Sequence, residues 1–182
     1  MQRRVAWFNE APIEPDPKGG LRSPDERVRL RCLEPAVALE GMGIDCSVFG
    51  NLGDADPAEV GQLLQKLKTD IVVIAPFNDP SLLKLAKAAK QLGCYVIADF
   101  GSATDVSDDF LKLASLADHI VAATPEAQAL LKTHSIACIV IPDCTTTQDA
   151  ETVAGAWLDC FTALKMKPPA CANSNIPATD NG

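Results

Sequence analysis

The sequence predicts an α/β fold in which helices cover both faces of a parallel sheet of about six strands, giving three layers, α/β/α. Short apolar runs of strand length alternate with amphipathic segments of helix length along most of the chain. The run at residues 70–76 is almost continuously apolar, which is typical of a strand covered on both faces. With 182 residues, 47% of them hydrophobic, the chain can bury one core. We therefore expect one domain at residues 1–166 and a disordered tail at residues 167–182.

The chain opens with a strand and a long loop. Residues 5–8, Val-Ala-Trp-Phe, form a short apolar run that ends in Asn9 and Glu10. Three prolines and the pair Gly19-Gly20 follow before residue 21, and these residues predict a loop without regular structure. In an open α/β sheet, the loops that leave the carboxyl ends of the strands bind ligands.

The first helix follows this loop. Ser23-x-x-Glu26 has the spacing of a capping box and places Pro24 at the first helical position, so we expect a helix that runs to about residue 42. Pro35 lies inside this helix and removes one backbone hydrogen bond, which predicts a kink near Arg31.

The remaining elements repeat the same alternation, and several helices begin at an Asp, Ser or Thr that can cap them. We predict strands at residues 45–50, 70–76, 94–99, 119–124 and 136–142, and helices at residues 57–67, 80–93, 107–116, 125–133 and 148–164. Strands separated by helices in this way predict a doubly wound, Rossmann-like sheet with right-handed crossovers, for which we expect the strand order 3-2-1-4-5-6.

Composition excludes several classes of partner. The net charge is −8 and the pI is near 4.7, with no basic stripe, so we expect no nucleic-acid partner. No apolar run approaches the roughly 20 residues that a membrane helix needs. The apolar run behind Arg3 and Arg4 is also shorter than a signal-peptide core of about 7–15 residues. We therefore expect a cytoplasmic protein with no membrane span.

The seven cysteines are spread through predicted strands and helices without a C-x-x-C pair. This distribution favours free thiols over a disulfide framework or a zinc site. His134, Cys138 and Cys144 are close in sequence, but the strand predicted between them points its side chains to alternate faces. We expect no metal and no cofactor, and no catalytic residue is identified.

The order of several motifs resembles the N-terminal, acceptor-side domain of GT-B glycosyltransferases, especially those of the glycosyltransferase-4 type. The first helix is similar to that family's first helix through the pattern Arg29-x-Arg31-x-x-x-Pro35-x-x-x-Leu39-x-x-x-Gly43. Two later passages resemble the family's "D-V-V" strand and its "D-x-v-v…V-I-P-N-G" passage, namely Asp70-Ile-Val-Val and Asp118-His-Ile-Val-Ala-Ala-Thr124 with Ile139-Val-Ile-Pro-Asp143. The resemblance covers about residues 3–145.

The resemblance implies a function and also a departure from the family. Where the family continues into a second domain that grips the nucleotide-sugar donor, this chain has Pro142-Asp143-Cys144, one predicted helix and the tail. The resemblance therefore implies a stand-alone GT-B-like domain that binds a carbohydrate or nucleotide-type ligand, including a nucleotide sugar. It further implies that the domain acts either alone, as a ligand-binding unit, or with a partner chain that supplies the donor-binding half; the isolated chain is expected to have no glycosyltransferase activity. The alternative is a non-catalytic protein-interaction module derived from a glycosyltransferase half.

A ligand site is expected where the first and fourth strands end, because these strands are neighbours in the order 3-2-1-4-5-6. Arg27 and Arg31 share a helix face and suit an anion, while Asp99 suits hydroxyl groups. The same residues also fit structural roles that involve no ligand: a flexible glycine loop, a solvated arginine face, and turn or cap residues. The candidate ligand-binding residues are Asn9, Glu10, Gly19, Gly20, Ser23, Arg27, Arg31, Asp99, Gly101, Ser102 and Thr104.

Four aromatic residues lie at or near the carboxyl ends of the predicted strands: Trp7, Phe8, Phe77 and Phe100. A GT-B half without its second domain leaves that face uncovered, so we expect these side chains to be exposed. An exposed apolar patch of this kind predicts a homo-oligomer or a partner chain.

Overall fold

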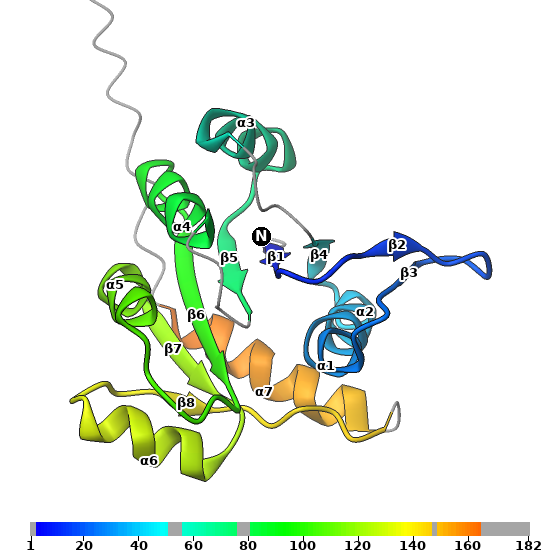
Figure 1. Cartoon of the computed structure of the whole chain (residues 1–182). Coiled ribbons are helices and arrows are strands. Elements are labelled where there is room, and N and C mark those ends of the chain that lie inside the picture. Colours follow the sequence, from blue (N-terminus) through cyan, green and yellow to red (C-terminus); the bar gives the residue numbers. More distant parts are fainter. Residues whose placement is uncertain (1–2, 51–55, 76–80, 147–148, 165–182) are drawn as a thin grey trace, which may run out of the picture.

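A six-stranded, all-parallel sheet forms the centre of the protein (Figure 1). The computed structural model describes residues 3–50, 56–75, 81–146 and 149–164. The strands of this sheet are β1 (Arg4–Phe8), β4 (Asp45–Phe49), β5 (Ile71–Ile74), β6 (Tyr95–Gly101), β7 (His119–Ala122) and β8 (Ile139–Val140).

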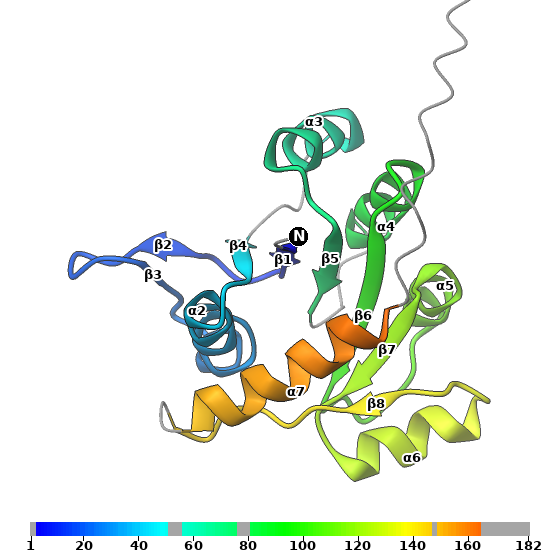
Figure 2. The same ribbon diagram turned by 180° about the vertical axis from the view of Figure 1, so that it is seen from behind.

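Helices pack on both faces of this sheet, so the doubly wound α/β class is confirmed. One face is covered by α1 (Glu26–Val28), the π-helical turn η1 (Arg29–Leu33), α2 (Glu34–Gly41) and α7 (Ala150–Ala163). The other face is covered by α3 (Pro57–Leu67), α4 (Ser81–Gln91), α5 (Asp108–Leu116) and α6 (Pro125–Thr133). Figure 2, the view from behind, shows α7 lying in front of the sheet. Successive side chains of each strand therefore enter two separate cores.

The strand order differs in one respect from the expected 3-2-1-4-5-6. The sheet runs β4-β1-β5-β6-β7-β8, so the six strands, numbered along the chain, lie in the order 2-1-3-4-5-6. The strand of residues 71–74 thus lies inside the sheet beside β1, where all four of its residues are buried. The expected order would have placed this apolar strand at an edge, whereas the half-buried β4 takes the edge instead. As a consequence, β5 separates β1 from β6, and the expected contact between the first and fourth strands is wrong.

The first helix begins later than its capping-box pattern predicts. Asp25 is the N-cap, because its carboxylate accepts a hydrogen bond from the Arg27 amide at 2.9 Å. Ser23 lies outside the helix, where its hydroxyl donates to the Pro12 carbonyl at 2.9 Å. Pro24 is therefore not the first helical residue, and the capping-box prediction is wrong.

The structure has a π-helical turn just before Pro35, where the sequence predicted a kink near Arg31. Residues 29–33 form η1, and the Glu34 amide donates to the carbonyl of Arg29, five residues back. Pro35 has no amide hydrogen to continue the ordinary α-helical ladder, so a wider turn just before it avoids an unsatisfied bond. Arg31, a buried residue of this turn, belongs to the site described below.

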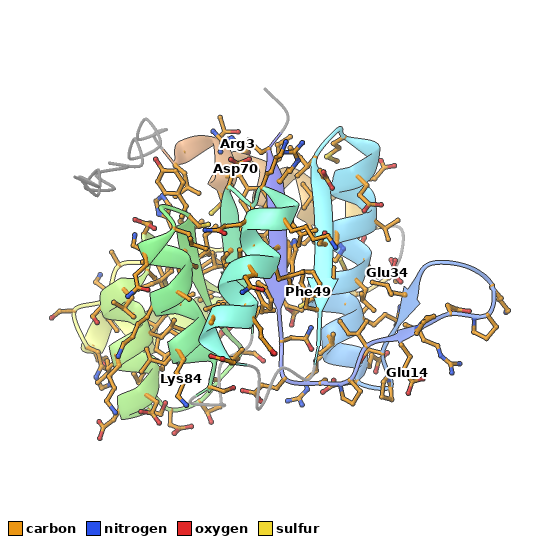
Figure 3. The ribbon with its side chains drawn as sticks, turned by 90° about the horizontal axis from the view of Figure 1, so that it is seen from above. Arg3, Glu14, Glu34, Phe49, Asp70 and Lys84 are labelled. Atoms are coloured by element: carbon orange, nitrogen blue, oxygen red, sulfur yellow. The ribbon has the colours of Figure 1, made fainter. Side chains whose placement is uncertain are left out.

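The sequence predicted no regular structure between β1 and the first helix, and this prediction is wrong. It contains an antiparallel hairpin of β2 (Glu14–Pro15) and β3 (Leu21–Arg22). Gly19 and Gly20 form its turn with φ of 98° and 83°, a conformation that glycine adopts without steric strain. Figure 3 shows this hairpin, with Glu14 labelled, extending away from the body of the protein.

Most other predicted elements are present with small shifts at their ends. Asp56, Ser107 and Thr124 cap α3, α5 and α6 through their side chains, as expected. The sixth strand is shorter than residues 136–142, since only Ile139–Val140 pair with β7. The predicted tail at residues 167–182 lies outside the described residues.

The aromatic residues expected to be exposed are buried, so that expectation is wrong for the three that the structure describes. Trp7 and Phe8 are 0% exposed and Phe100 is 4% exposed. Trp7 packs edge-on against Trp157 of α7 with ring centroids 4.7 Å apart, and Phe100 packs against a ring of α5. The helices cover the ends of these strands. Phe77 lies outside the described residues, and the argument for an oligomer from exposed aromatics does not hold.

The described cysteines are free thiols, as the sequence predicted. Burial raises their pKa values, for example to about 12 for Cys46 and about 11 for Cys94. Cys171 lies outside the described residues. Within the described ranges, no three His, Cys, Asp or Glu side chains gather as a metal site would require, and no helix has the length and apolar character to cross a membrane.

A substitution at Gly50 tests how the hairpin joins the sheet. An added Cβ would lie 2.2 Å from the Ala11 carbonyl oxygen and 2.9 Å from the Ile13 amide nitrogen, so the backbone would have to move. We expect Gly50→Ala to lower the free energy of unfolding by about 1–3 kcal/mol in urea titrations. Gly61→Ala is the matched control, because that site in α3 is open and alanine favours helix by about 0.5–1 kcal/mol. Equal changes in the free energy of unfolding for the two variants would contradict the close approach of Ala11 and Ile13 to Gly50.

Candidate functional site

A pocket of about 290 Å³ lies where β6 ends and α5 begins. Its walls come from three parts of the chain that are distant in sequence: the first helical turns, the segment from the end of β6 into α5, and Asp143, which follows β8. The residues that line it are Arg27, Arg31, Phe100, Gly101, Ser102, Ala103, Thr104, Asp105, Ser107, Phe110 and Asp143. The pocket is thus at the carboxyl edge of the sheet, where ligands bind in open α/β folds.

The end of β6 has an irregular backbone that opens this pocket. The pairing register with β7 shifts between Asp99 and Gly101, and Gly101 has φ of 62°. One carboxylate oxygen of Asp99 accepts from the Gly101 amide at 2.9 Å, which fixes the turn. The chain then leaves the sheet until Ser107 caps α5 by accepting from the Phe110 amide at 3.1 Å. Residues 102–105 therefore lie at the mouth of the pocket.

Arg31, which lines the pocket, forms a buried ion pair with Asp99 behind the pocket wall. The two side chains are 4% and 0% exposed. Two parallel hydrogen bonds join them, from Nε to Oδ2 at 2.7 Å and from Nη2 to Oδ1 at 2.8 Å. Nη1 donates to the Ile141 carbonyl and lies 3.1 Å from Oδ1 of Asp143. Arg31 therefore ties η1 to β6 and to the segment between β8 and α7.

The charges around Arg31 stabilise its cationic form. Burial by itself lowers the pKa of Arg31, but the charge and hydrogen bonds of Asp99, with the charge of Asp143, raise it above its ordinary value. The guanidinium carbon also lies 5.4 Å from the ring centroid of Trp157, within the range of a cation–π contact. Arg31 is thus a fixed, paired cation and not the solvated one that its position on the first helix suggested.

The other charged groups of the pocket are more accessible. Arg27 is 78% exposed and its Nη2 lies 3.0 Å from the Asp25 carboxylate. The hydrogen bond and charge of Asp25 raise the pKa of Arg27. Burial and the charge of Asp99 raise the pKa of Asp143, and the nearby Arg31 opposes this only in part. Because the two lining arginines face two lining carboxylates, Asp105 and Asp143, the pocket has no excess of positive charge.

The structure brings together about half of the residues that the sequence suggested for a ligand site. Arg27, Arg31, Gly101, Ser102 and Thr104 line the pocket, and Asp99 lies directly behind Arg31. The other five candidates lie outside the lining: Asn9, Glu10, Gly19, Gly20 and Ser23.

These five residues belong to the segment between β1 and the first helix. Asn9 is fully buried, and its backbone and side-chain amides both donate to the Phe49 carbonyl. Gly19 and Gly20 form the turn of the projecting hairpin, and Ser23 bonds to Pro12 near its base. The hairpin carries them away from the end of β6 because β5 separates β1 from β6.

Sequence reasoning missed Asp143 and the two phenylalanines of the pocket. Asp143 follows the last predicted strand, and carboxyl ends of parallel strands share one edge, so its position was a usable signal. Phe110 gave no such signal, because an apolar residue of an amphipathic helix is expected in the core, and Phe100 was expected to be exposed to a partner rather than to line a pocket. Ser107, another lining residue, is the cap of α5.

The fold and the pocket define a class before any comparison: a single doubly wound α/β unit with a small polar site at its carboxyl edge. No protein-family model matches the chain, and no curated protein matches it.

Solved structures similar to this one include UDP-N-acetylglucosamine 2-epimerases. One has 14% identity and a TM-score of 0.57, with 82% of this chain and 50% of that chain covered. Another, from Neisseria meningitidis and bound to UDP-GlcNAc, has 14% identity and a TM-score of 0.56, with 89% and 51% covered. The chain thus spans about half the length of these proteins, and its fold is similar to one Rossmann-like half of GT-B fold enzymes.

Proposed function

We propose that this chain is a GT-B-like domain that binds a small, hydroxyl-rich ligand of the sugar or nucleotide-sugar type in the pocket between β6 and α5. The observation that carries the proposal is the convergence of polar side chains over two buried aromatic rings. Ser102, Thr104 and Asp105 offer hydroxyl and carboxylate groups at the mouth, while Phe100 and Phe110 lie within the lining. Concave sites with a few converging polar groups and an apolar base are the usual form of small-molecule sites.

The volume of the pocket favours one ring-sized group. Ligand sites commonly measure about 300–1,000 Å³, and this pocket, at about 290 Å³, lies just below that range. A sugar ring fits such a volume, whereas a whole nucleotide sugar extends beyond it. We propose that the sugar, rather than the nucleotide, occupies the described pocket.

The charges of the pocket support hydroxyl groups over phosphate. Arg31 is already hydrogen-bonded to Asp99 and ion-paired with Asp143, and Arg27 is paired with Asp25, so neither guanidinium is an uncompensated cation. A phosphate would have to displace a carboxylate or lie close to one, at a cost in repulsion. A sugar hydroxyl can instead donate to a carboxylate and accept from an arginine.

Glycosyl transfer by a domain of this kind also requires donor-binding groups. The similar epimerases are about twice as long as the stretch they share with this chain. We propose that transfer requires a second, donor-binding half and that the described domain alone does not catalyse it.

Chemical-shift mapping by NMR tests the proposal. The library contains monosaccharides, sugar phosphates and nucleotides, and we expect monosaccharides to shift the amide signals of residues 101–107 and of Arg27. The amides of α3 serve as an internal control, because this helix lies away from the pocket lining. Shifts confined to other surfaces, or no shifts with any compound, would contradict the proposal and favour a protein-interaction module.

A further inference from the structure

We propose that Asp143 determines which ligand the pocket accepts: one carboxylate oxygen stays on Arg31, while the other accepts a hydrogen bond from a ligand hydroxyl, and the negative charge excludes phosphate. This inference rests on the proposed function and adds the residue that selects between ligand classes.

The geometry of Asp143 separates its two oxygens. Oδ1 is buried and lies 3.1 Å from Nη1 of Arg31. The side chain as a whole is nevertheless 43% exposed, so its accessible surface lies on the remaining atoms, and Asp143 is one of the residues that line the pocket. A carboxylate oriented by a buried arginine presents its second oxygen in a defined direction without losing further side-chain entropy on binding.

Asp99 and Asp143 share Arg31 unequally. Asp99 accepts two hydrogen bonds from the guanidinium and a third from the Gly101 amide, all of them buried. Asp143 makes one contact with the guanidinium, from a side chain that is partly open to the pocket. Asp99 is therefore a positioning residue, and Asp143 is the carboxylate of this cluster that a ligand can reach.

The charge of the cluster explains the selection against phosphate. Asp99, Arg31 and Asp143 together carry one negative charge at neutral pH, because one guanidinium faces two carboxylates. Replacing Asp143 by asparagine keeps the shape and a hydrogen-bond acceptor but makes this cluster neutral. Sugar binding and phosphate binding should then change in opposite directions, whereas loss of a purely structural contact would weaken both.

Protonation of Asp143 should have the same effect as the asparagine substitution. Burial raises the pKa of Asp143, so its carboxylate is lost at a higher pH than an ordinary aspartate's as the solution becomes acidic. Sugar affinity should therefore fall as pH falls through this raised pKa. The charged and titratable groups around Asp143 are Arg31 on η1, Asp99 on β6, the neighbouring thiols Cys32 and Cys144, and Arg27 and Asp105 across the pocket.

The experiment compares two probes, N-acetylglucosamine and inorganic phosphate, on the wild-type chain and on Asp143→Asn. We expect the variant to bind N-acetylglucosamine about tenfold more weakly, the order expected for a lost hydrogen bond to a charged group. We expect it to bind phosphate roughly two- to fivefold more tightly, as for removal of one partly exposed like charge. The sugar affinity of the wild type should depend on pH below neutrality, and that of the variant should be nearly constant.

Asp109→Asn is the control, because this carboxylate of α5 pairs with Lys112 outside the pocket lining and should alter neither affinity. Parallel weakening of both probes in Asp143→Asn, or no change in either, would overturn the inference while leaving the proposed function intact. If wild type binds no N-acetylglucosamine at residues 101–107, the proposed function fails. The phosphate comparison still decides the charge effect, and unchanged phosphate binding in Asp143→Asn overturns it.

Discussion

Asp99→Asn is expected to lower the free energy of unfolding by about 3–5 kcal/mol, because it leaves the Arg31 guanidinium buried without its main counter-charge. The ion pair is almost fully buried and has two parallel hydrogen bonds, so water cannot replace the lost carboxylate. Asparagine is nearly the same size, which makes charge rather than volume the variable. Urea unfolding followed by circular dichroism at pH 7 measures the difference.

A matched variant and a double variant give this prediction its controls. Asp109→Asn removes the same charge from an exposed pair with Lys112 and should cost less than about 1 kcal/mol. Arg31→Met combined with Asp99→Asn removes both charges and should recover part of the loss, since a broken buried pair costs more than an absent one. A loss below about 1 kcal/mol for Asp99→Asn alone would mean that the pair contributes little.

Trp157→Ala is expected to cost about 3–5 kcal/mol, the range for removing a fully buried large aromatic side chain. Trp157 is 0% exposed, lies edge-on to Trp7 with centroids 4.7 Å apart, and packs on Phe161. It also forms the surface under the Arg31 guanidinium. Its loss should therefore loosen α7 from the sheet and weaken ligand binding in the pocket as well.

Fluorescence and urea titrations test this second prediction together. The chain has two tryptophans, so the emission of Trp157→Ala reports Trp7 alone, and we expect a red shift as Trp7 becomes accessible to water. Thr152→Ala, an exposed position on the same helix, is the control and should change stability by less than about 0.5 kcal/mol. An unchanged Trp7 spectrum would show that α7 does not depend on this contact.

Local signals in the sequence predicted most secondary structure. Asp56, Ser107 and Thr124 were recognisable as caps, and the helices they begin are present with almost the expected ends. These signals work because a cap depends on a hydrogen bond between residues two or three positions apart. The same logic failed at Ser23, where a contact with Pro12 across the base of the hairpin competes for the side chain.

The candidate site was predicted in part for a similar reason. Arg27, Gly101, Ser102 and Thr104 were named because they lie near the ends of a helix or strand, and that edge of the sheet does carry the pocket. Gly19 and Gly20 were named for their backbone freedom, which serves a hairpin turn instead. Asp143 was missed, because its partner Arg31 is more than a hundred residues earlier in the chain.

The sequence by itself determined that this protein is a doubly wound α/β domain, since apolar periodicity, helix caps and the glycines and prolines of turns act over a few residues. The tertiary structure alone decided the strand order, the burial of Arg31, and its sharing between Asp99 and Asp143. Pattern and propensity show which face of an element is buried but not which element covers it. From the sequence, an arginine on the first helix is therefore expected to be solvated. Only the structure shows that the end of β6 and the residues after β8 pack against it.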